Sequence, residues 1–391
     1  MLRVDSYLGR IVILLKERGG ENVKWTLISD DLSGACETGS AINQALNITS
    51  TRLRSYNVVT LFSMGMVPNF EPISLFDLNI RDQTSDTALR IFVDFLTILE
   101  SRNPKSVNFF KVDSLLRGNL AVQVSLLAER NPQIFIPAVP SLNRLVQNGE
   151  VFIQNVPLNE TDLWKNEQRI PPKKIRELFP DLKVIDGKFN AIQDTENVLN
   201  RMSAGEIFIP DITTTEDIAT ISHLLKKFPH VIPLGSAEFA AAHFRAFQGS
   251  HLANGEDVVP RGIVSATVVI GSHSEASRSQ LAYLQSLSHM PLSAEDKYVE
   301  VTHRDDLIDL YLGNFQSQAL FISGGTTARR ILDAAGITRL RMLNALEYGV
   351  ALGISAEGQL IGIKPGSFGR EDTISKSLAT MLAISTLSNR N

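Results

Sequence analysis

The sequence predicts an α/β protein of two domains, each with a mainly parallel sheet flanked by helices, and an active site in the interdomain cleft. Three observations predict this fold class. The chain has 391 residues, which is long for one core and suits two domains. Its apolar runs are nearly continuous, as in strands covered on both faces. Short strand-like runs alternate with helical stretches, which favours a parallel sheet.

The first series of elements runs from residue 25 to residue 138. Strands are expected at 25–29, 58–64, 73–78, 106–112 and 134–138, and helices at 34–46, 84–99 and 120–129. The helix at 84–99 shows the pattern best, because Leu89, Phe92, Val93 and Leu96 recur at helical spacing.

The second half of this domain begins after a polar, broken stretch at 142–172, in which 151–156 predicts one arm of a hairpin. Strands follow at 184–186, 206–210 and 231–235, with a helix at 215–228. The turn-forming segment 248–262 is weakly patterned and predicts a linker between domains at 1–247 and 263–391.

The second domain is expected to begin with a strand at 263–271 and a helix at 275–287. A strand at 319–323 and a helix at 327–335 follow, then a strand pair at 352–355 and 359–363 and a last helix at 372–387. No internal repeat or low-complexity tract interrupts this order.

Composition and charge exclude several classes of protein. The net charge of −4 gives no electrostatic reason to bind nucleic acid or an anionic membrane. No apolar run approaches the length of a membrane span, and the run at 11–15 is too short for a signal peptide. The single cysteine, Cys36, excludes an internal disulfide. We therefore expect a cytoplasmic protein.

Two polar clusters follow strands in the first domain, where ligands of open α/β sheets bind. Asp30 and Asp31 form an adjacent carboxylate pair that needs a cation or substrate hydroxyls to offset its charge, although Asp31 or Ser33 as a simple helix cap stays open. The segment 111–119 brings together Lys111, Asp113, Ser114, Arg117 and Asn119. Such a set can hold a carboxylate and hydroxyls, with a solvated turn as the alternative.

Three glycine-containing turns follow strands in the second domain. They carry Ser272, His273 and Ser274; Gly324, Gly325, Thr326 and Thr327; and Lys364, Gly366 and Gly369. Turns of this kind present backbone N–H groups to an anion, so the three together favour nucleotide phosphates. His273 is expected to be a loop residue and Cys36 a small packing residue.

Several familiar sites are missing from the sequence. It has no GxxxxGK[ST] loop and no GxGxxG fingerprint, so neither standard nucleotide-binding motif is present. It has no GxSxG elbow, and its seven histidines show no metal-ligand spacing.

Taken together, the clusters resemble the four-carbon acid sugar kinase family. The matching segments are ISDDLSGACETGSA (28–41), KVDSLLRGN (111–119), PAVPSLNRLVQNGEVFIQNVPLNET (137–161), IPDITTTEDI (209–218), GSHSEASRSQ (271–280), ISGGTTARRIL (322–332) and KPGSFGRED (364–372). They occur in the order of the family and span most of the chain.

The resemblance implies an acid-sugar-binding first domain, an ATP-binding second domain, and transfer of the γ-phosphoryl group to a terminal hydroxyl of threonate, erythronate or an oxo-tetronate, with Mg²⁺. Asp31 and Asp113 are the catalytic candidates. The substrate-binding candidates are Asp30, Arg81, Lys111, Ser114, Arg117 and Asn119. The nucleotide-binding candidates are Ser272, Ser274, Gly324, Gly325, Thr326, Thr327, Lys364, Gly366 and Gly369. The metal ligands and a homo-oligomeric state stay open.

The chain departs from the family pattern at four positions. Leu115 replaces a usual threonine, Thr326 an acidic residue, and Asn143 and Glu238 two glycines. These changes keep two alternatives open. One is an impaired relative that serves as a sugar-acid or nucleotide sensor or as a partner subunit. The other is a kinase on the same body for a different small molecule.

Overall fold

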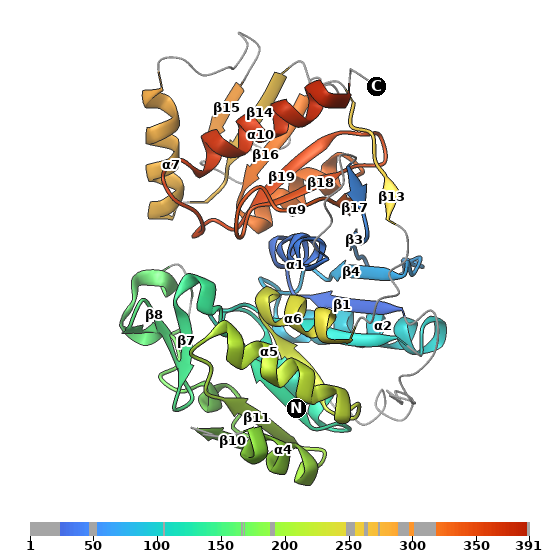
Figure 1. The fold of residues 1–391 in the computed structure, drawn as a ribbon, viewed down its shortest axis with the longest axis vertical. Helices are drawn as coiled ribbons and strands as arrows, with labels where there is room; N and C mark the ends of the chain where they lie inside the picture. Colours follow the sequence, from blue (N-terminus) through green and yellow to red (C-terminus); the bar gives the residue numbers. More distant parts are fainter. Residues whose placement is uncertain are drawn as a thin grey trace. The chain divides into compact units, whose positions relative to one another are not determined.

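The structure is a computed structural model, shown in Figure 1. It describes residues 24–46, 53–104, 106–165, 167, 169–187, 192–247, 255–261, 265–272, 274–287, 297–300 and 318–388. His273 therefore lies outside the described residues, and so does more than half of the predicted linker at 248–262.

The chain divides into two compact units. Unit 1 consists of Met1–Asp30, Phe62–Ser74 and Leu78–Ser250, and unit 2 of Asp31–Leu61, Leu75–Asp77 and His251–Asn391. The chain thus passes from unit 1 to unit 2 between Asp30 and Asp31. Further along the sequence, it passes from unit 2 to unit 1 between Asp77 and Leu78. The strand β4 (Ile73–Asp77) is shared between them. The domain limits predicted from the sequence stay a prediction.

Unit 1 is built on parallel strands. Their order is β10 (Lys183–Gly187), β11 (Glu206–Pro210), β6 (Gln133–Ile136), β12 (Ile232–Gly235), β5 (Val107–Lys111) and β1 (Trp25–Ser29). Each neighbouring pair is parallel, so all six carboxyl ends meet at one edge. Five of these strands, all except β10, are buried along their whole length in residues such as Ile28, Phe109 and Phe135, which explains the continuous apolar runs in the sequence.

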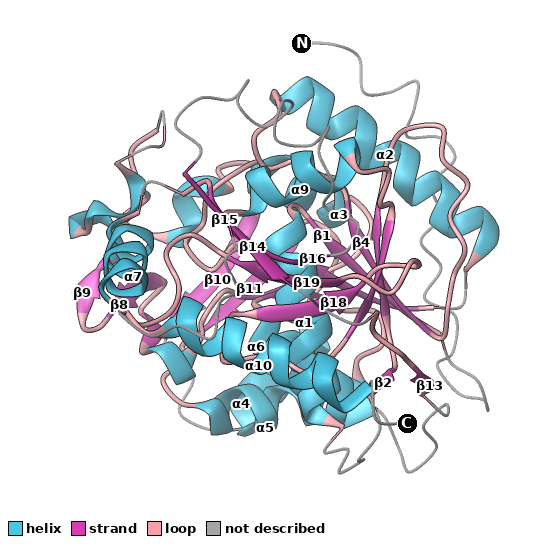
Figure 2. Cartoon of the chain, turned by 90° about the horizontal axis from the view of Figure 1, so that it is seen from above, coloured by secondary structure: helices cyan, strands magenta, loops and turns pink. Residues whose placement is uncertain are grey.

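Helices cover both faces of these strands. Figure 2 shows α2 (Ser85–Arg102) and α3 (Leu120–Ala128) on one face, and α4 (Ile192–Arg201), α5 (Thr215–Leu224) and α6 (Ala237–Phe247) on the other. The start of α5 is a capping box, in which Thr214 and Asp217 each bond the other's backbone N–H. A separate antiparallel sheet joins β7 (Arg144–Gln147), β8 (Glu150–Ile153) and β9 (Val156–Pro157).

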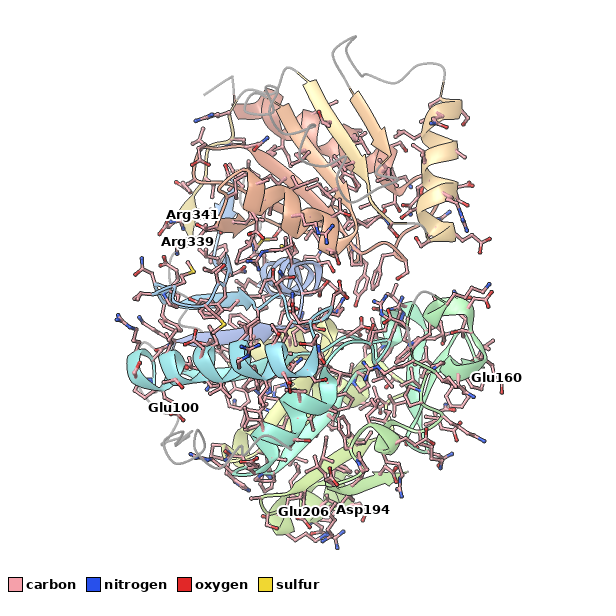
Figure 3. The ribbon with its side chains drawn as sticks, turned by 180° about the vertical axis from the view of Figure 1, so that it is seen from behind. Glu100, Glu160, Asp194, Glu206, Arg339 and Arg341 are labelled. Carbon is pink, nitrogen blue, oxygen red and sulfur yellow. The ribbon has the colours of Figure 1, made fainter. Side chains whose placement is uncertain are left out.

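Unit 2 combines a parallel and an antiparallel set of strands. The parallel set is β15 (Lys297–Glu300), β14 (Ser265–Ile270), β16 (Gln318–Ser323) and β19 (Leu360–Lys364). The antiparallel set is β18 (Ala351–Ile354), β17 (Arg339–Met342) and β3 (Val58–Leu61). On β17, Arg339 and Arg341 lie on one face (Figure 3), and Leu340 and Met342 are buried on the other. A short pair, β2 (Arg54–Ser55) with β13 (Glu256–Asp257), completes the unit.

Among the described residues of unit 2, four helices pack with its strands. They are α1 (Leu32–Ala45), α7 (Glu275–Ser286), α9 (Gly325–Ala334) and α10 (Thr373–Ser388). Figure 2 shows α9 and α10 on opposite faces of the strands. The helix α1 contacts α9, β3, β17 and β18, and nearly all its residues are buried. Close packing needs small residues there, because a Cβ on Gly39 would lie 2.7 Å from Asn57 Oδ1.

The predicted α/β fold class is confirmed, with the antiparallel strands of unit 2 as an added feature. The strand at 206–210 and the pair at 351–354 and 360–364 lie where the sequence indicates. The helices α4 and α6 and the strand β17 were not predicted. Within the described residues, no helix has both the length and the apolar character that crossing a bilayer requires.

Candidate functional site

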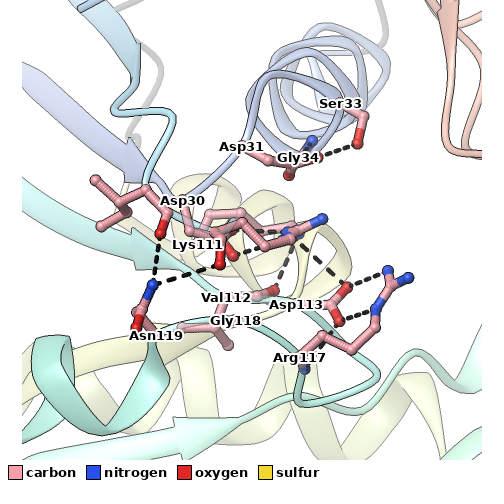
Figure 4. A network of polar contacts seen from close by, with 12 residues as sticks. Asp30, Asp31, Ser33, Gly34, Lys111, Val112, Asp113, Arg117, Gly118 and Asn119 are labelled. Atoms are coloured by element: carbon pink, nitrogen blue, oxygen red, sulfur yellow. Dashed lines mark hydrogen bonds and ion pairs between the residues drawn. The ribbon is translucent and has the colours of Figure 1, made fainter. Parts of the chain in front are cut away.

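The carboxyl ends of β1 and β5 place the two predicted polar clusters at one edge of unit 1. The strands are parallel and pair Ser29 with Lys111, so Asp30 and the segment that begins at Val112 leave the sheet side by side. This is the edge at which open α/β sheets bind their ligands. Figure 4 shows the resulting network of polar contacts.

Asp30, the residue that follows β1, belongs to this network and is fully buried. Arg81 binds it with two parallel hydrogen bonds, Nε to Oδ2 at 2.7 Å and Nη2 to Oδ1 at 2.8 Å. The carbonyl of Asp30 also accepts from the backbone N–H groups of Ile80 and Arg81. A Cβ on Gly118 would lie 2.9 Å from Arg81 Cγ, so glycine permits this close approach.

Asp113 and Arg117 form a second forked pair in the turn after β5. Arg117 donates from Nε to Oδ2 at 2.7 Å and from Nη2 to Oδ1 at 3.0 Å, and Arg81 Nη2 lies 3.9 Å from Oδ1. Burial alone would raise the pKa of Asp113, but the charges of Arg117, Arg81 and Lys111 hold that pKa well below its ordinary value. Asp113 therefore stays ionised and is a weak proton acceptor.

The other predicted residues of this cluster hold its backbone. Lys111 is buried and donates from Nζ to the carbonyl of Val112 at 3.0 Å. Asn119 is the N-cap residue of α3, and its amide donates to the carbonyls of Ile80 at 2.7 Å and Gln83 at 2.8 Å. Asn119 thus ties the turn after β5 to the loop that carries Arg81.

Arg144 belongs to the same cluster and was missed in the sequence. It is buried on β7 and donates from Nη1 to Ser114 Oγ at 2.8 Å. The 30 residues between the two positions hide this contact from any local pattern. With Arg144, four cations (Arg81, Lys111, Arg117 and Arg144) surround two carboxylates (Asp30 and Asp113). The surplus of positive charge suits a bound anion.

Asp31 is held differently from Asp30, within unit 2. It is the N-cap of α1 and accepts from the backbone N–H of Gly34 at 2.9 Å, as the helix-cap interpretation requires. Its Oδ2 accepts from the hydroxyl of Ser33, a contact visible in Figure 4. The two consecutive aspartates therefore have different partners.

The glycine turn before α9 lies directly against Asp31. A Cβ on Gly325 would lie 2.6 Å from Asp31 Oδ2 and 2.8 Å from Ser33 Oγ. Gly324 is the N-cap with φ of 116°, and no side chain caps the helix. A glycine N-cap brings no side chain of its own to the first N–H groups of α9, and a helix start of this kind suits an anion. Thr326 is exposed, and Thr327 is buried against the position that a Cβ on Gly271 would fill.

The two remaining turns of unit 2 meet through a group of hydroxyls. Ser274 and Ser277 donate to the carbonyl of Gly366 at 2.6 and 3.0 Å, and Ser272 contacts Ser274 at 3.2 Å. A Cβ on Gly366 would lie 1.9 Å from Ser272 Oγ, so only glycine fits. Ser274 also caps α7.

Lys364 organises the turn that it begins. Its Nζ is fully buried and donates to the carbonyls of Pro365, Gly366 and Phe368, each at 3.0 Å. These bonds use all three donors of an ammonium group, so Lys364 holds the loop and does not reach outward. Burial lowers the pKa of Lys364 to about 7. Gly369 has φ of 89°, which favours glycine.

Three of the departures from the family pattern have a visible local conformation or contact. Asn143 adopts the left-handed conformation, φ of 53° and ψ of 40°, which glycine and asparagine both tolerate. Glu238 accepts from the hydroxyl of Ser141 at 2.7 Å, and burial raises its pKa. Leu115 is buried, and its carbonyl accepts from Trp164 Nε1 at 2.8 Å.

A cationic cluster after the parallel strands of unit 1 and a glycine turn at a helix start in unit 2 define a two-unit α/β protein suited to two anionic ligands. Two family models match the chain: a sugar-binding N-terminal domain at 25–243 and a nucleotide-binding C-terminal domain at 307–374. The chain belongs to the four-carbon acid sugar kinase family.

Two curated relatives are similar to the chain in sequence. A D-threonate kinase of Cupriavidus necator is 25% identical and aligns with 89% of this chain and 96% of its own length. A D-erythronate kinase of Heliobacterium modesticaldum is 22% identical and aligns with 50% of this chain and 47% of its own length.

Two solved structures are similar in fold. A protein of Haemophilus influenzae has a TM-score of 0.62 at 16% identity and covers 91% of this chain and 100% of its own. A protein of Salmonella typhimurium LT2 has a TM-score of 0.67 at 16% identity and covers 90% of this chain and 98% of its own. At this identity the likeness concerns the fold alone.

Proposed function

We propose that the protein is an ATP-dependent kinase that phosphorylates a terminal hydroxyl of a four-carbon acid sugar such as threonate, erythronate or an oxo-tetronate. The names of the two curated relatives support this class of reaction. The surplus of cations in the cluster of unit 1 supports an acidic substrate, and the glycine N-cap of α9 supports a phosphate ligand.

The observation that carries the proposal is the division of roles between two consecutive carboxylates. Asp30 is anchored by Arg81 in the cationic cluster, and Asp31 lies at the glycine turn of α9. The two carboxylates are consecutive in the chain, so one peptide bond joins the residue of the acid cluster to the residue of the glycine turn. Phosphoryl transfer depends mainly on alignment and charge, which these two groups of residues would supply.

In this mechanism, Lys111 and Arg117 orient the carboxylate or hydroxyls of the acid. Asp31 accepts the proton of the attacking hydroxyl, since Asp113 is committed to Arg117 and has a pKa far below that of a useful base. Asp113 instead fixes the guanidinium of Arg117. The backbone N–H groups after Gly324 hold the phosphates, and closure around the ligands excludes water.

The residues of unit 2 fit a nucleotide triphosphate with Mg²⁺. Gly271, Gly325 and Gly366 stand where any Cβ would meet a neighbouring side chain, so glycine permits the close packing of the three turns. Among the residues that the structure describes, no three His, Cys, Asp or Glu side chains gather to hold a metal. Mg²⁺ would neutralise phosphate charge when bound, and such ions are usually held by one or two carboxylates together with phosphate oxygens and water.

A panel of three- to six-carbon sugar acids tests the proposal. ADP release would be measured with each acid, with and without Mg²⁺, and the product identified by mass. We expect Mg²⁺-dependent turnover with at least one four-carbon acid. Binding of an acid or of ATP without any turnover would favour the sensor alternative, for which Thr326 at the start of α9 is the motivating departure. Turnover only with other acids would favour a kinase of different specificity.

A further inference from the structure

A buried ion pair in unit 2 has no part in the mechanism above. Arg329 lies on α9, one turn after the glycine turn, and is 4% exposed, and Asp77 ends β4 and is fully buried. Arg329 Nη1 donates to Asp77 Oδ2 at 2.9 Å and to the carbonyl of Asp77 at 3.4 Å. Its Nε donates to Asp333, one turn further along α9, at 2.9 Å.

This pair is costly to bury, so its geometry needs a physical reason. Burial alone would lower the pKa of Arg329, but Asp77 and Asp333 raise it, and the guanidinium stays charged. Well-packed apolar residues can replace buried ion pairs without loss of stability, which makes stability a weak explanation. The planar guanidinium of Arg329 joins a helix to the end of a strand and fixes both the direction and the distance of that contact. It is therefore suited to positioning the strand end relative to the helix.

The residues that follow Asp77 lead directly into the acid cluster. The N–H of Leu78 donates to the carbonyl of Ser29 at 3.0 Å, and the N–H groups of Ile80 and Arg81 donate to the carbonyl of Asp30 at 2.9 and 3.2 Å. The side chain of Arg81 then binds the carboxylate of Asp30. Only three residues of chain, 78–80, thus separate Asp77, which holds α9, from Arg81, which holds Asp30.

We propose that Arg329 is a positioning residue that couples nucleotide binding at the start of α9 to acid binding at the Asp30–Arg81 pair. The inference rests on the proposed function and assigns it a further residue. Phosphate bound at the glycine turn orders the first turns of α9, and Arg329 transmits that order to Asp77. The loop at 78–81 then holds Arg81 in the geometry that binds the acid.

Calorimetry on the full chain tests the proposal with D-threonate, or D-erythronate if it binds better, as probe. The dissociation constant of the acid is measured with and without the non-hydrolysable ATP analogue AMP-PNP and Mg²⁺. We expect the analogue to tighten acid binding at least about fivefold in the parent. The coupling ratio is the dissociation constant of the acid without the analogue divided by that with it. In Arg329→Gln, this ratio should fall to about one, while each ligand alone binds within about threefold of the parent.

Three further variants separate positioning from folding. The double variant Asp77→Asn/Arg329→Gln removes both charges together and so avoids an unpaired carboxylate at Asp77. Its ratio should also fall to about one. Arg329→Lys should recover only part of the ratio, because an ammonium lacks the fork. Arg330→Gln removes the neighbouring, exposed guanidinium and should keep the ratio. A partly unfolded sample binds fewer ligands per chain but keeps the ratio.

The results distinguish this inference from the function on which it rests. If the parent shows the ratio and Arg329→Gln keeps it, or if the parent shows none, the positioning role is wrong and the kinase proposal stands. If the parent binds neither acid, the proposed function is wrong, and this inference fails with it.

Discussion

Asp30 and Asp31 look equivalent in the sequence and have different environments in the structure. Asp30 is buried in a fork with Arg81, and Asp31 caps α1 beside Gly325. The sequence could predict the pair and the cap, because both follow from a strand end and a helix start. It could not predict the partner of Asp30, which lies 51 residues away.

Asp31→Asn should lower turnover by about 10²-fold or more, because asparagine cannot accept the proton of the attacking hydroxyl. Asparagine caps a helix as well as aspartate does, so stability should change little. The measurements are kcat in the presence of the preferred acid, and the affinity for AMP-PNP, which should stay within about threefold.

Asp86→Asn is the matched control for this variant, since Asp86 lies in the first turn of α2 and is exposed. It should leave kcat unchanged. Turnover of Asp31→Asn near the parental value would remove Asp31 from the catalytic residues.

At the scale of elements, the buried strands were the easiest to predict. The strand β11 was predicted residue for residue, because strands buried on both faces appear as apolar runs bounded by turns. The strand β17 was missed because two of its four residues are exposed-face arginines, Arg339 and Arg341. The glycine turns were predicted, but which turns contact each other could not be, because those contacts join distant segments.

Gly325→Ala should weaken nucleotide binding by about tenfold or more, because the added Cβ would collide with Asp31 and Ser33 and displace the start of α9. Acid binding in the absence of nucleotide should stay close to that of the parent. Calorimetry with AMP-PNP and with the acid separately measures both effects.

Gly336→Asn is the matched control at the other end of α9. Gly336 has φ of 67°, a conformation that asparagine tolerates, and a Cβ there would meet nothing within 4 Å. Equal loss of nucleotide affinity in both variants would argue for general loosening of α9 and against a phosphate site at Gly325.

The lowered pKa of Lys364 should make the free energy of unfolding depend on pH. Its pKa is lowered to about 7 by burial, against 10.5 in the unfolded chain, so the unfolded state binds more protons between these values. Stability from this group therefore rises with pH across that window, by at most about 1.4 kcal/mol per pH unit. Lys364→Met should abolish this contribution.

Urea unfolding of parent and variant between pH 7 and 10 measures the difference in slope. Lys376→Met, at an exposed position on α10, is the control and should keep the parental slope. A Lys364→Met variant with the parental slope would show that the lysine keeps its proton throughout this range.

At the scale of the whole molecule, the compact units are discontinuous in the chain, and the domain limits at 1–247 and 263–391 stay a prediction. The segment Asp31–Leu61 precedes most of unit 1 in the chain yet belongs to unit 2, where α1 packs against β17, β18 and α9. The sequence predicts a helix at 34–46. Local periodicity carries no information on which strands cover this helix, so its place in unit 2 could not be predicted.

A fragment of residues 255–391 should therefore fail to fold, because it lacks α1 and β3 and would expose the apolar surface that they cover. Far-ultraviolet circular dichroism and cooperative urea unfolding would test this, with the full chain as reference. A fragment that unfolds cooperatively and binds AMP-PNP would instead support the domain limits expected from the sequence.

Cys36 sits on α1 with no exposed surface, and burial, with Asp77 and Asp31 nearby, raises the pKa of its thiol. It is also the chain's single cysteine. An alkylating reagent can therefore reach a thiolate only when α1 lifts away from its surroundings. The rate of labelling then reports how often α1 opens. A fall in this rate when a ligand is added would show that the ligand stabilises the position of the helix.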